Sequence, residues 1–110
     1  MGDVAKRLVG PTLITAITSG TAQTLYTVAA STKTIVRDIL VANNDSVDRA
    51  ITLSIGADAV GTRLLPAIVV PANGVLSRTG SIVLEATETL RSFGSVASQL
   101  TLTISGVEIT

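Results

Sequence analysis

The chain has 110 residues and a formal net charge of zero, with eight basic and eight acidic side chains. It has no Cys and no His, and aromatic residues make up 2%. These numbers exclude a disulfide framework and a thiolate metal site. They also argue against nucleic acid as a partner, because the chain has neither a basic excess nor aromatic stacking platforms.

Hydrophobic residues make up 46% of the chain and charged residues 15%. A domain of this length buries only about two-thirds of the surface of its unfolded chain. Large apolar patches left on a surface usually mark contact sites. The composition therefore predicts a homo-oligomer or an assembly with other proteins. The alternative is that Ser and Thr supply the missing surface polarity.

Residues 1–23 differ from the remainder, because Gly10–Pro11 and Ser19–Gly20 interrupt them and no clean alternation begins before Thr24. We expect an N-terminal arm here, with a strand only at residues 13–17, followed by a β-sandwich domain over residues 24–110. The segment weakly resembles a secretory signal, but Asp3 and Gly10–Pro11 break that pattern. No apolar run reaches the about 20 residues of a membrane-spanning helix.

Alternation of apolar and polar residues is the main structural signal further along. Ile51, Leu53 and Ile55 are separated by Thr52 and Ser54, which is the pattern of a half-buried strand. Leu100, Leu102 and Ile104 repeat it. Turn residues at intervals of about 8–12 residues separate such segments. Including the N-terminal one, the expected strands cover residues 13–17, 24–28, 34–42, 50–56, 63–70, 75–84, 89–93 and 99–110.

About eight short strands with these turns predict an all-β fold, an antiparallel β-sandwich of the jelly-roll or immunoglobulin-like type. Asn73-Gly74 is a turn pair, because both residues tolerate positive φ. Residues 83–91 lack a helical apolar face and predict a short turn. In the last strand the phase slips at Gly106, which predicts a β-bulge there, with Val107 and Ile109 pointing inward.

No set of residues predicts catalysis, a cofactor or a metal. Without His, a Ser nucleophile would need Lys6 or Lys33 as its base, and Lys33 lies in a turn. The carboxylate pairs Glu85/Glu88 and Asp45/Asp48 indicate no cleft. Residues 43–48 offer several oxygen ligands for calcium but match no calcium loop, so a hairpin loop with Asx turns is expected.

Five residues are candidates for binding a protein partner. Lys6, Arg7 and Leu8 lie in the expected arm. Arg37 and Asp38 are adjacent in one strand, so their side chains should face opposite sides and one should point inward or lie at a sheet rim. Such a charge either protects an edge strand or forms a salt bridge with a neighbouring subunit.

Several stretches resemble small structural proteins of tailed bacteriophages. They are LYTV at residues 25–28, TIVRDILVAN at 34–43, AITLSIGADAVGTR at 50–63, VPAN at 70–73, IVLEA at 82–86 and ISGVEI at 104–109. The resemblance covers about residues 24–110 and depends on order and spacing. It implies a β-sandwich virion component present in many copies, either a capsid decoration or minor capsid protein or a tail or fibre domain.

The short length and the lack of a fibre-like repeat favour capsid decoration. The expected function is therefore that of a non-enzymatic structural protein, with itself and the major capsid or tail proteins as partners, located in the virion. The alternative is a binding module of the tail tip or fibre, whose loops at residues 43–48 and 57–62 contact the host surface.

Overall fold

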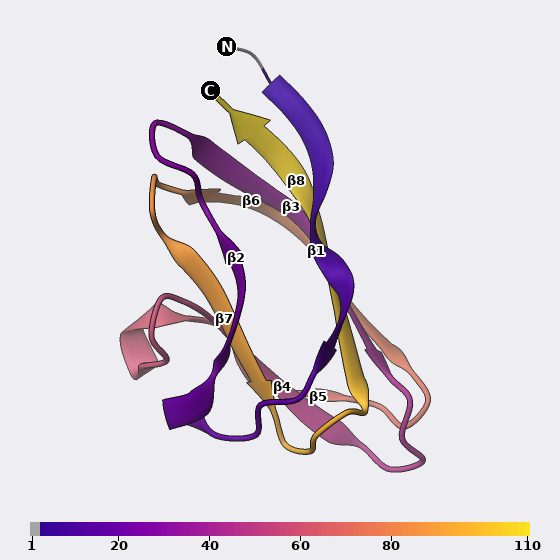
Figure 1. Cartoon of the computed structure of the whole chain (residues 1–110). Coiled ribbons are helices and arrows are strands. Elements are labelled where there is room, and N and C mark those ends of the chain that lie inside the picture. Colours follow the sequence, from indigo (N-terminus) through magenta and orange to yellow (C-terminus); the bar gives the residue numbers. More distant parts are fainter. Residues whose placement is uncertain (1–2) are drawn as a thin grey trace.

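The computed structural model describes residues 3–110, which form two four-stranded sheets packed face to face (Figure 1). The elements are β1 (Asp3–Ile14), η1 (Ser19–Thr21), β2 (Gln23–Thr27), β3 (Lys33–Asn43), β4 (Arg49–Ile55), η2 (Val60–Thr62), β5 (Arg63–Val70), β6 (Val75–Leu84), β7 (Thr89–Gly94) and β8 (Leu100–Ile109). The short η elements are single 3-10 turns. The all-β fold and the eight strands are thus confirmed.

The strand order identifies the topology. One sheet has the order β1-β8-β3-β6 and is called the β8 sheet; the other has the order β2-β7-β4-β5 and is called the β7 sheet. Antiparallel pairs join β1 to β8, β2 to β7, β3 to β6 and β4 to β5. The chain therefore runs as a long hairpin rolled over itself, which is a jelly roll and not an immunoglobulin-like sandwich.

The core lies between the sheets and contains the residues that alternation selected. Ile51, Leu53, Leu100, Leu102 and Ile104 are all 0% exposed. Removing such side chains from water stabilises the fold by about 25 cal/mol per Å² of apolar surface. Ile55, also expected to point inward, is only half-buried.

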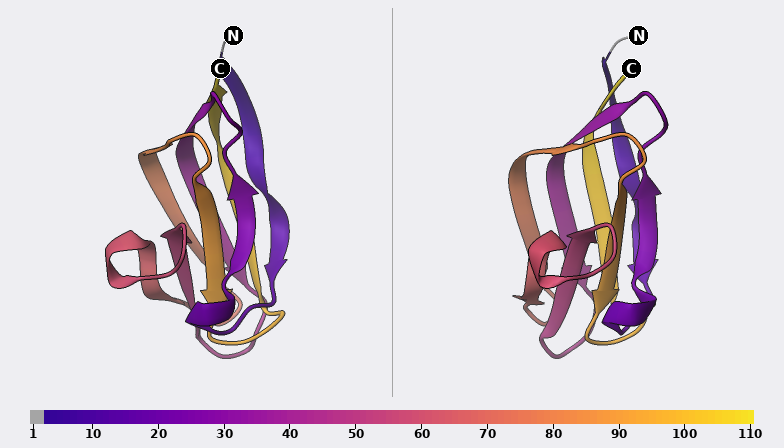
Figure 2. Two further views of the ribbon diagram at one scale, coloured as in Figure 1. Left: turned by 60° about the vertical axis from the view of Figure 1, so that its left-hand side comes forward. Right: turned by 90° about the vertical axis from the view of Figure 1, so that its left-hand side faces the viewer.

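On the opposite face of β4, Thr52 and Ser54 are buried as well, 4% and 1% exposed. Residues 56–62 lie on this outer side of the β7 sheet (Figure 2). The Ser54 hydroxyl donates to the carbonyl oxygens of Gly56 and Arg91. Both faces of this strand are therefore covered, which alternation alone did not predict.

The N-terminal segment corrects the expectation of an arm. Residues 3–14 form β1, an edge strand of the β8 sheet that pairs with β8 from Asp3–Ile109 to Ile14–Leu100. Register shifts at Leu8 and between Val9 and Thr12 break the alternation. For this reason the sequence pattern showed a strand only near residue 13.

The expected bulge at Gly106 lies instead in the two strands that flank it. β8 keeps its phase, so Val107 and Ile109 face outward and are half-exposed, contrary to the expectation. The extra residues are Leu8 in β1, and Arg37 in β3 between Val36 and Asp38. Gly106 of β8 lies between these two bulges, one in each neighbouring strand.

Candidate interaction surfaces

The loop between β3 and β4, residues 43–48, is held by a buried amide. Asn43 is 2% exposed, and its Oδ1 accepts the backbone N–H of Asp45 at 2.9 Å, which is an Asx turn. Its Nδ2 donates to three carbonyl oxygens, at 3.0 Å from Val47, 3.0 Å from Val70 and 3.3 Å from Pro71. The loop is thereby tied to the β5–β6 turn, and the expectation of an Asx turn is confirmed. The expectation of a hairpin was wrong, because β3 and β4 belong to different sheets.

The carboxylates of this loop also hold N–H groups of the chain. Arg49 Nε donates to Asp45 at 2.8 Å, and this hydrogen bond lowers the pKa of Asp45. The Ala72 backbone N–H donates to Asp48 at 2.9 Å. Among residues 3–110, no cluster of three or more carboxylates is placed to hold a metal. The carboxylates of Asp45 and Asp48 thus accept hydrogen bonds from other groups of the chain.

The Asp58 carboxylate joins two loops on the outer side of the β7 sheet through hydrogen bonds. This group of contacts is called the Asp58 staple. Its carboxylate is 1% exposed and accepts two hydrogen bonds from Arg63, at 2.8 and 2.9 Å. Ser19 of η1 donates a third. These hydrogen bonds, first that of Arg63 and then that of Ser19, lower the pKa of Asp58 to about 2.

We expect the Asp58 staple to make stability depend on acid. A carboxyl with a lowered pKa in the folded chain stabilises the fold above its ordinary value of 3.8 and loses that contribution as pH falls toward about 2. Asp58→Asn should lower the melting temperature at pH 6 and flatten its fall on acidification. Thermal unfolding between pH 6 and pH 2 measures this, with Glu85→Gln, at a carboxylate whose side chain is 61% exposed, as control. Parallel curves for D58N and wild type would contradict it.

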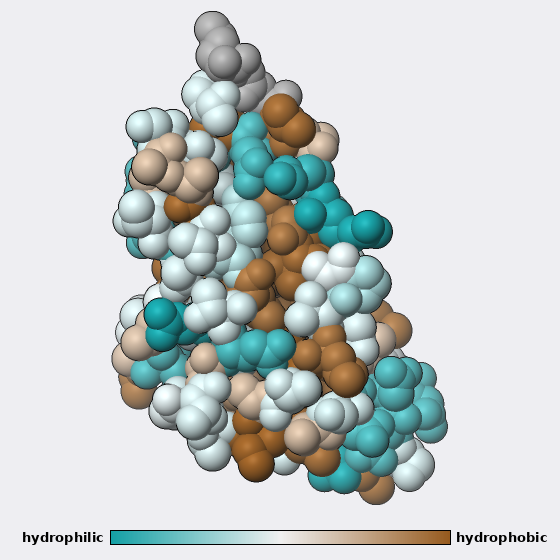
Figure 3. Space-filling model, in the orientation of Figure 1, coloured by the Kyte–Doolittle hydropathy of each residue, from teal (hydrophilic) through white to brown (hydrophobic). Residues whose placement is uncertain are grey.

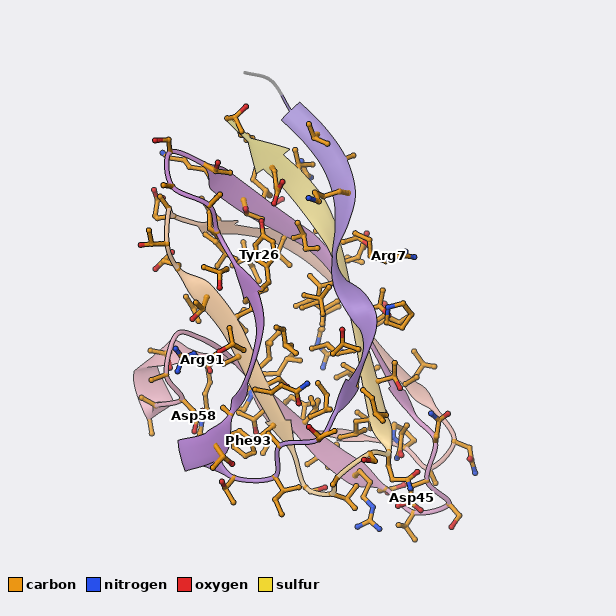
Figure 4. The ribbon with its side chains drawn as sticks, in the orientation of Figure 1. Arg7, Tyr26, Asp45, Asp58, Arg91 and Phe93 are labelled. Atoms are coloured by element: carbon orange, nitrogen blue, oxygen red, sulfur yellow. The ribbon has the colours of Figure 1, made fainter. Side chains whose placement is uncertain are left out.

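A group of hydrogen-bonded polar side chains links the two sheets near the chain ends (Figure 4). The Tyr26 hydroxyl, from β2, lies 2.8 Å from the Thr34 hydroxyl of β3 and donates to Glu108 of β8. Lys6 Nζ lies 3.2 Å from the other Glu108 oxygen. Burial, and then the Glu108 carboxylate, raise the pKa of Tyr26, whereas the hydrogen bond from Tyr26, and then Lys6, lower that of Glu108.

A mainly apolar pocket of about 370 Å³ lies at the same end, where the β2–β3 loop, the β6–β7 turn and β8 meet. At its rim, Lys33 and Glu85 lie 3.8 Å apart and are more than half exposed. The backbone N–H of Glu85 donates to Glu88 Oε1 at 2.7 Å, which confirms a turn at this point in the chain.

The outer face of the β8 sheet is uncovered. The register places four rows across it: Ala5, Val107, Ile35 and Val83; Arg7, Ser105, Asp38 and Thr79; Thr103, Leu40 and Ser77; and Leu13, Thr101, Ala42 and Val75. Val83, Leu40, Leu13 and Val75 are 51%, 42%, 43% and 56% exposed. Within residues 3–110 no element crosses this face, since η1 and η2 lie beside the other sheet (Figure 2).

A further apolar strip reaches the surface between the edges of β1 and β2, flanked by polar side chains (Figure 3). Leu25 of β2 packs against the core while remaining partly exposed.

The predicted partner-binding residues separate into two groups. Leu8 is 9% exposed and packs in the core, and Lys6 pairs with Glu108. Arg7, Arg37 and Asp38 are exposed on the outer face of the β8 sheet, and Arg7 points away from the β7 sheet (Figure 4). None of these three forms an ion pair within residues 3–110.

Arg37 and Asp38 correct the expectation that one of them points inward. Arg37 is the extra residue of the bulge, so it lies on the same side of β3 as Asp38, and both charges face solvent. Their strand, β3, lies between β8 and β6, so the charges do not protect an edge. Sequence reasoning missed the Tyr26–Glu108 and Asp58–Arg63 contacts, which join residues far apart in the chain or in irregular loops.

No family model matches the chain, and no curated protein matches it in sequence. A solved structure of the Drosophila NLP-core, described in terms of pentamer formation and histone binding, aligns over 100% of both chains with 15% identity and a TM-score of 0.49. Values this low establish neither a shared fold nor a shared function. In the described part of the chain, no helix is long and apolar enough to cross a bilayer.

Proposed function

We propose that this chain is a non-enzymatic structural protein, present in many copies, that decorates or stabilises the capsid of a tailed bacteriophage. The observation that carries the proposal is the outer face of the β8 sheet. It presents Val83, Leu40, Leu13 and Val75 to solvent with no element of residues 3–110 over it. Exposed apolar patches of this kind mark protein–protein contacts.

Two further features support a scaffold over a catalyst. The sequence has no His or Cys, and the carboxylates of Asp45, Asp48 and Asp58 accept hydrogen bonds that hold loops in place. The jelly roll is used by viral capsid proteins, but also by lectins and cupins. The fold is therefore compatible with the resemblance of residues 24–110 to phage virion proteins, and the surface supplies the functional argument.

The location of the chain in the particle tests the proposal. We expect mass spectrometry of virions, purified from the phage that encodes the chain, to find it in many copies, and labelled protein to decorate the head. Labelling confined to the tail would favour the host-binding alternative, in which residues 43–48 and 57–62 make the contacts. Absence from the virion would overturn both.

A further inference from the structure

We infer that the outer face of the β8 sheet is covered by a second copy of this chain, packed face to face about a two-fold axis parallel to β8. This deepens the proposed function, because it names the partner and the face of the multi-copy assembly. The argument uses the size of the face, its charges and the order of its rows.

The face is large enough for a stable dimer. About an axis over β8 the strands β1, β8 and β3 overlap; three strands at a spacing of about 4.8 Å, with the 10 residues of β8 at about 3.3 Å each, give a flat area of about 480 Å². A pleated surface with side chains has a larger accessible area than its flat projection. The value is therefore of the order of the about 800 Å² per partner that stable interfaces bury.

The charges on the face are complementary to those of a second copy. Arg7 on β1 and Asp38 on β3 belong to one row, with Ser105 of β8 between them. Two strand spacings separate their backbones by about 10 Å. Each is exposed and has no ion-pair partner within residues 3–110. Arg37, the bulge residue next to Asp38, is a further exposed charge on this face, so the crossed pair that the face offers is Arg7 with Asp38. A surface that carries such a positive and a negative group on either side of its centre can pair with itself.

The row order selects the axis. A two-fold axis parallel to β8 above Ser105 exchanges the positions of β1 and β3 and leaves each row facing its own copy. Arg7 then faces Asp38 of the second copy, and Asp38 faces Arg7 of the second copy. Val107 meets Val107 and Ala5 meets Ile35 of the second copy, so this apolar row packs on itself. The mixed rows do likewise over β1, β8 and β3, and β6 extends beyond the overlap.

An axis perpendicular to the strands gives a poorer interface. It would place Arg7 against Arg7 and Asp38 against Asp38, and like charges in contact are unfavourable. It would also lay apolar Val107 on Thr103 of the second copy, because rows on either side of Ser105 would exchange. Both axes keep the strands of the two copies aligned, as in sheets that pack at about 30° and about 10 Å, so the charges and the row order decide between them.

Charge exchange tests the pairing directly. In sedimentation equilibrium of the full chain, Arg7→Asp alone and Asp38→Arg alone should each weaken dimerisation at least about tenfold. The double variant R7D/D38R should restore it, because the crossed pairs are re-formed with reversed sign. A double variant as weak as the single variants would overturn the pairing, as would a wild-type chain that stays monomeric at high concentration.

A matched pair of substitutions tests the face. Leu40→Lys, at a 42% exposed position in β3 of the β8 sheet, should weaken dimerisation. Val69→Lys, at a 57% exposed position in β5 of the β7 sheet, should leave it unchanged. The opposite ranking would place the interface on the other sheet and overturn the proposal. Circular dichroism checks that both variants fold.

Cross-linking tests the axis. The chain has no Cys, so Ser105→Cys introduces a single thiol on the axis, where it faces its own copy. A short bis-maleimide should join S105C into covalent dimers, whereas S77C, two strands away in β6, should react poorly. Equal yields would overturn the axis. A chain that dimerises but is absent from virions would remove the capsid role alone, and a monomer found in virions would remove the dimer alone.

Discussion

Gly106→Ala should destabilise the fold by about 3 kcal/mol or more, because β8 has no room for a side chain between the two bulges. A Cβ at this position would lie 2.1 Å from the carbonyl oxygen of Ile35 and 3.0 Å from Cδ1 of Leu8. The Leu8 methyl can rotate away, but the Ile35 oxygen belongs to the backbone of β3. Moving it would disturb the β3–β8 ladder next to the Arg37 bulge.

Urea and thermal unfolding measure this effect, and the melting temperature of G106A should fall by more than about 10 °C. Gly61→Ala in η2 is the matched control, because no atom lies within 4 Å of its Cβ position. Its free energy of unfolding should stay within about 0.5 kcal/mol of the wild-type value. Equal free energies of unfolding for G106A and G61A would contradict the prediction, because they would show that β3 and β8 can move apart at Gly106 with little loss of stability.

Leu102→Ala is the second substitution with a large expected effect. Leu102 is 0% exposed and lies opposite Val41 of β3 and Thr12 of β1, in the middle of the β8 sheet. Truncation removes buried methyl groups and leaves a cavity, which together cost about 2–5 kcal/mol.

Thr101→Ala, one residue earlier, is the control. Thr101 is half-exposed on the outer face of the same strand, so its truncation leaves no buried cavity. The expected loss is below about 1 kcal/mol, the size of a strand-propensity effect. Denaturant unfolding of both variants gives the comparison. Similar losses at the two positions would show that the face assignment of β8 is wrong.

Alternation was a reliable guide where strands are regular. The phase of residues 100–104 and of 51–53 follows from side chains that point to opposite faces of a strand, so the buried set could be predicted from these residues alone. The turns were likewise local. Asn73 has a φ of 53°, and the Gly74 backbone N–H donates to Pro71 at 2.9 Å, as the turn pair predicts.

The failures all occur at irregular places. A bulge adds one residue to a strand, so Leu8 hid the strand character of β1, and Arg37 let two adjacent charges face the same side. The prediction of a bulge at Gly106 was wrong, because the extra residues lie in the two neighbouring strands, which the sequence could not show. The position of a bulge depends on the opposite strand, and here the partners of β8 lie about 70 and 100 residues away in the chain.

The sequence by itself determined an antiparallel β-sandwich, most of its strands and the centre of its core, because these follow from local alternation and turn chemistry. The tertiary structure decided the rest. It chose the jelly-roll order, made residues 3–14 an edge strand, and buried Leu8 while leaving Arg7 and Asp38 exposed in one row. The physical reason is that strand pairing across long stretches of chain sets the register, and the register decides which side chains share a face.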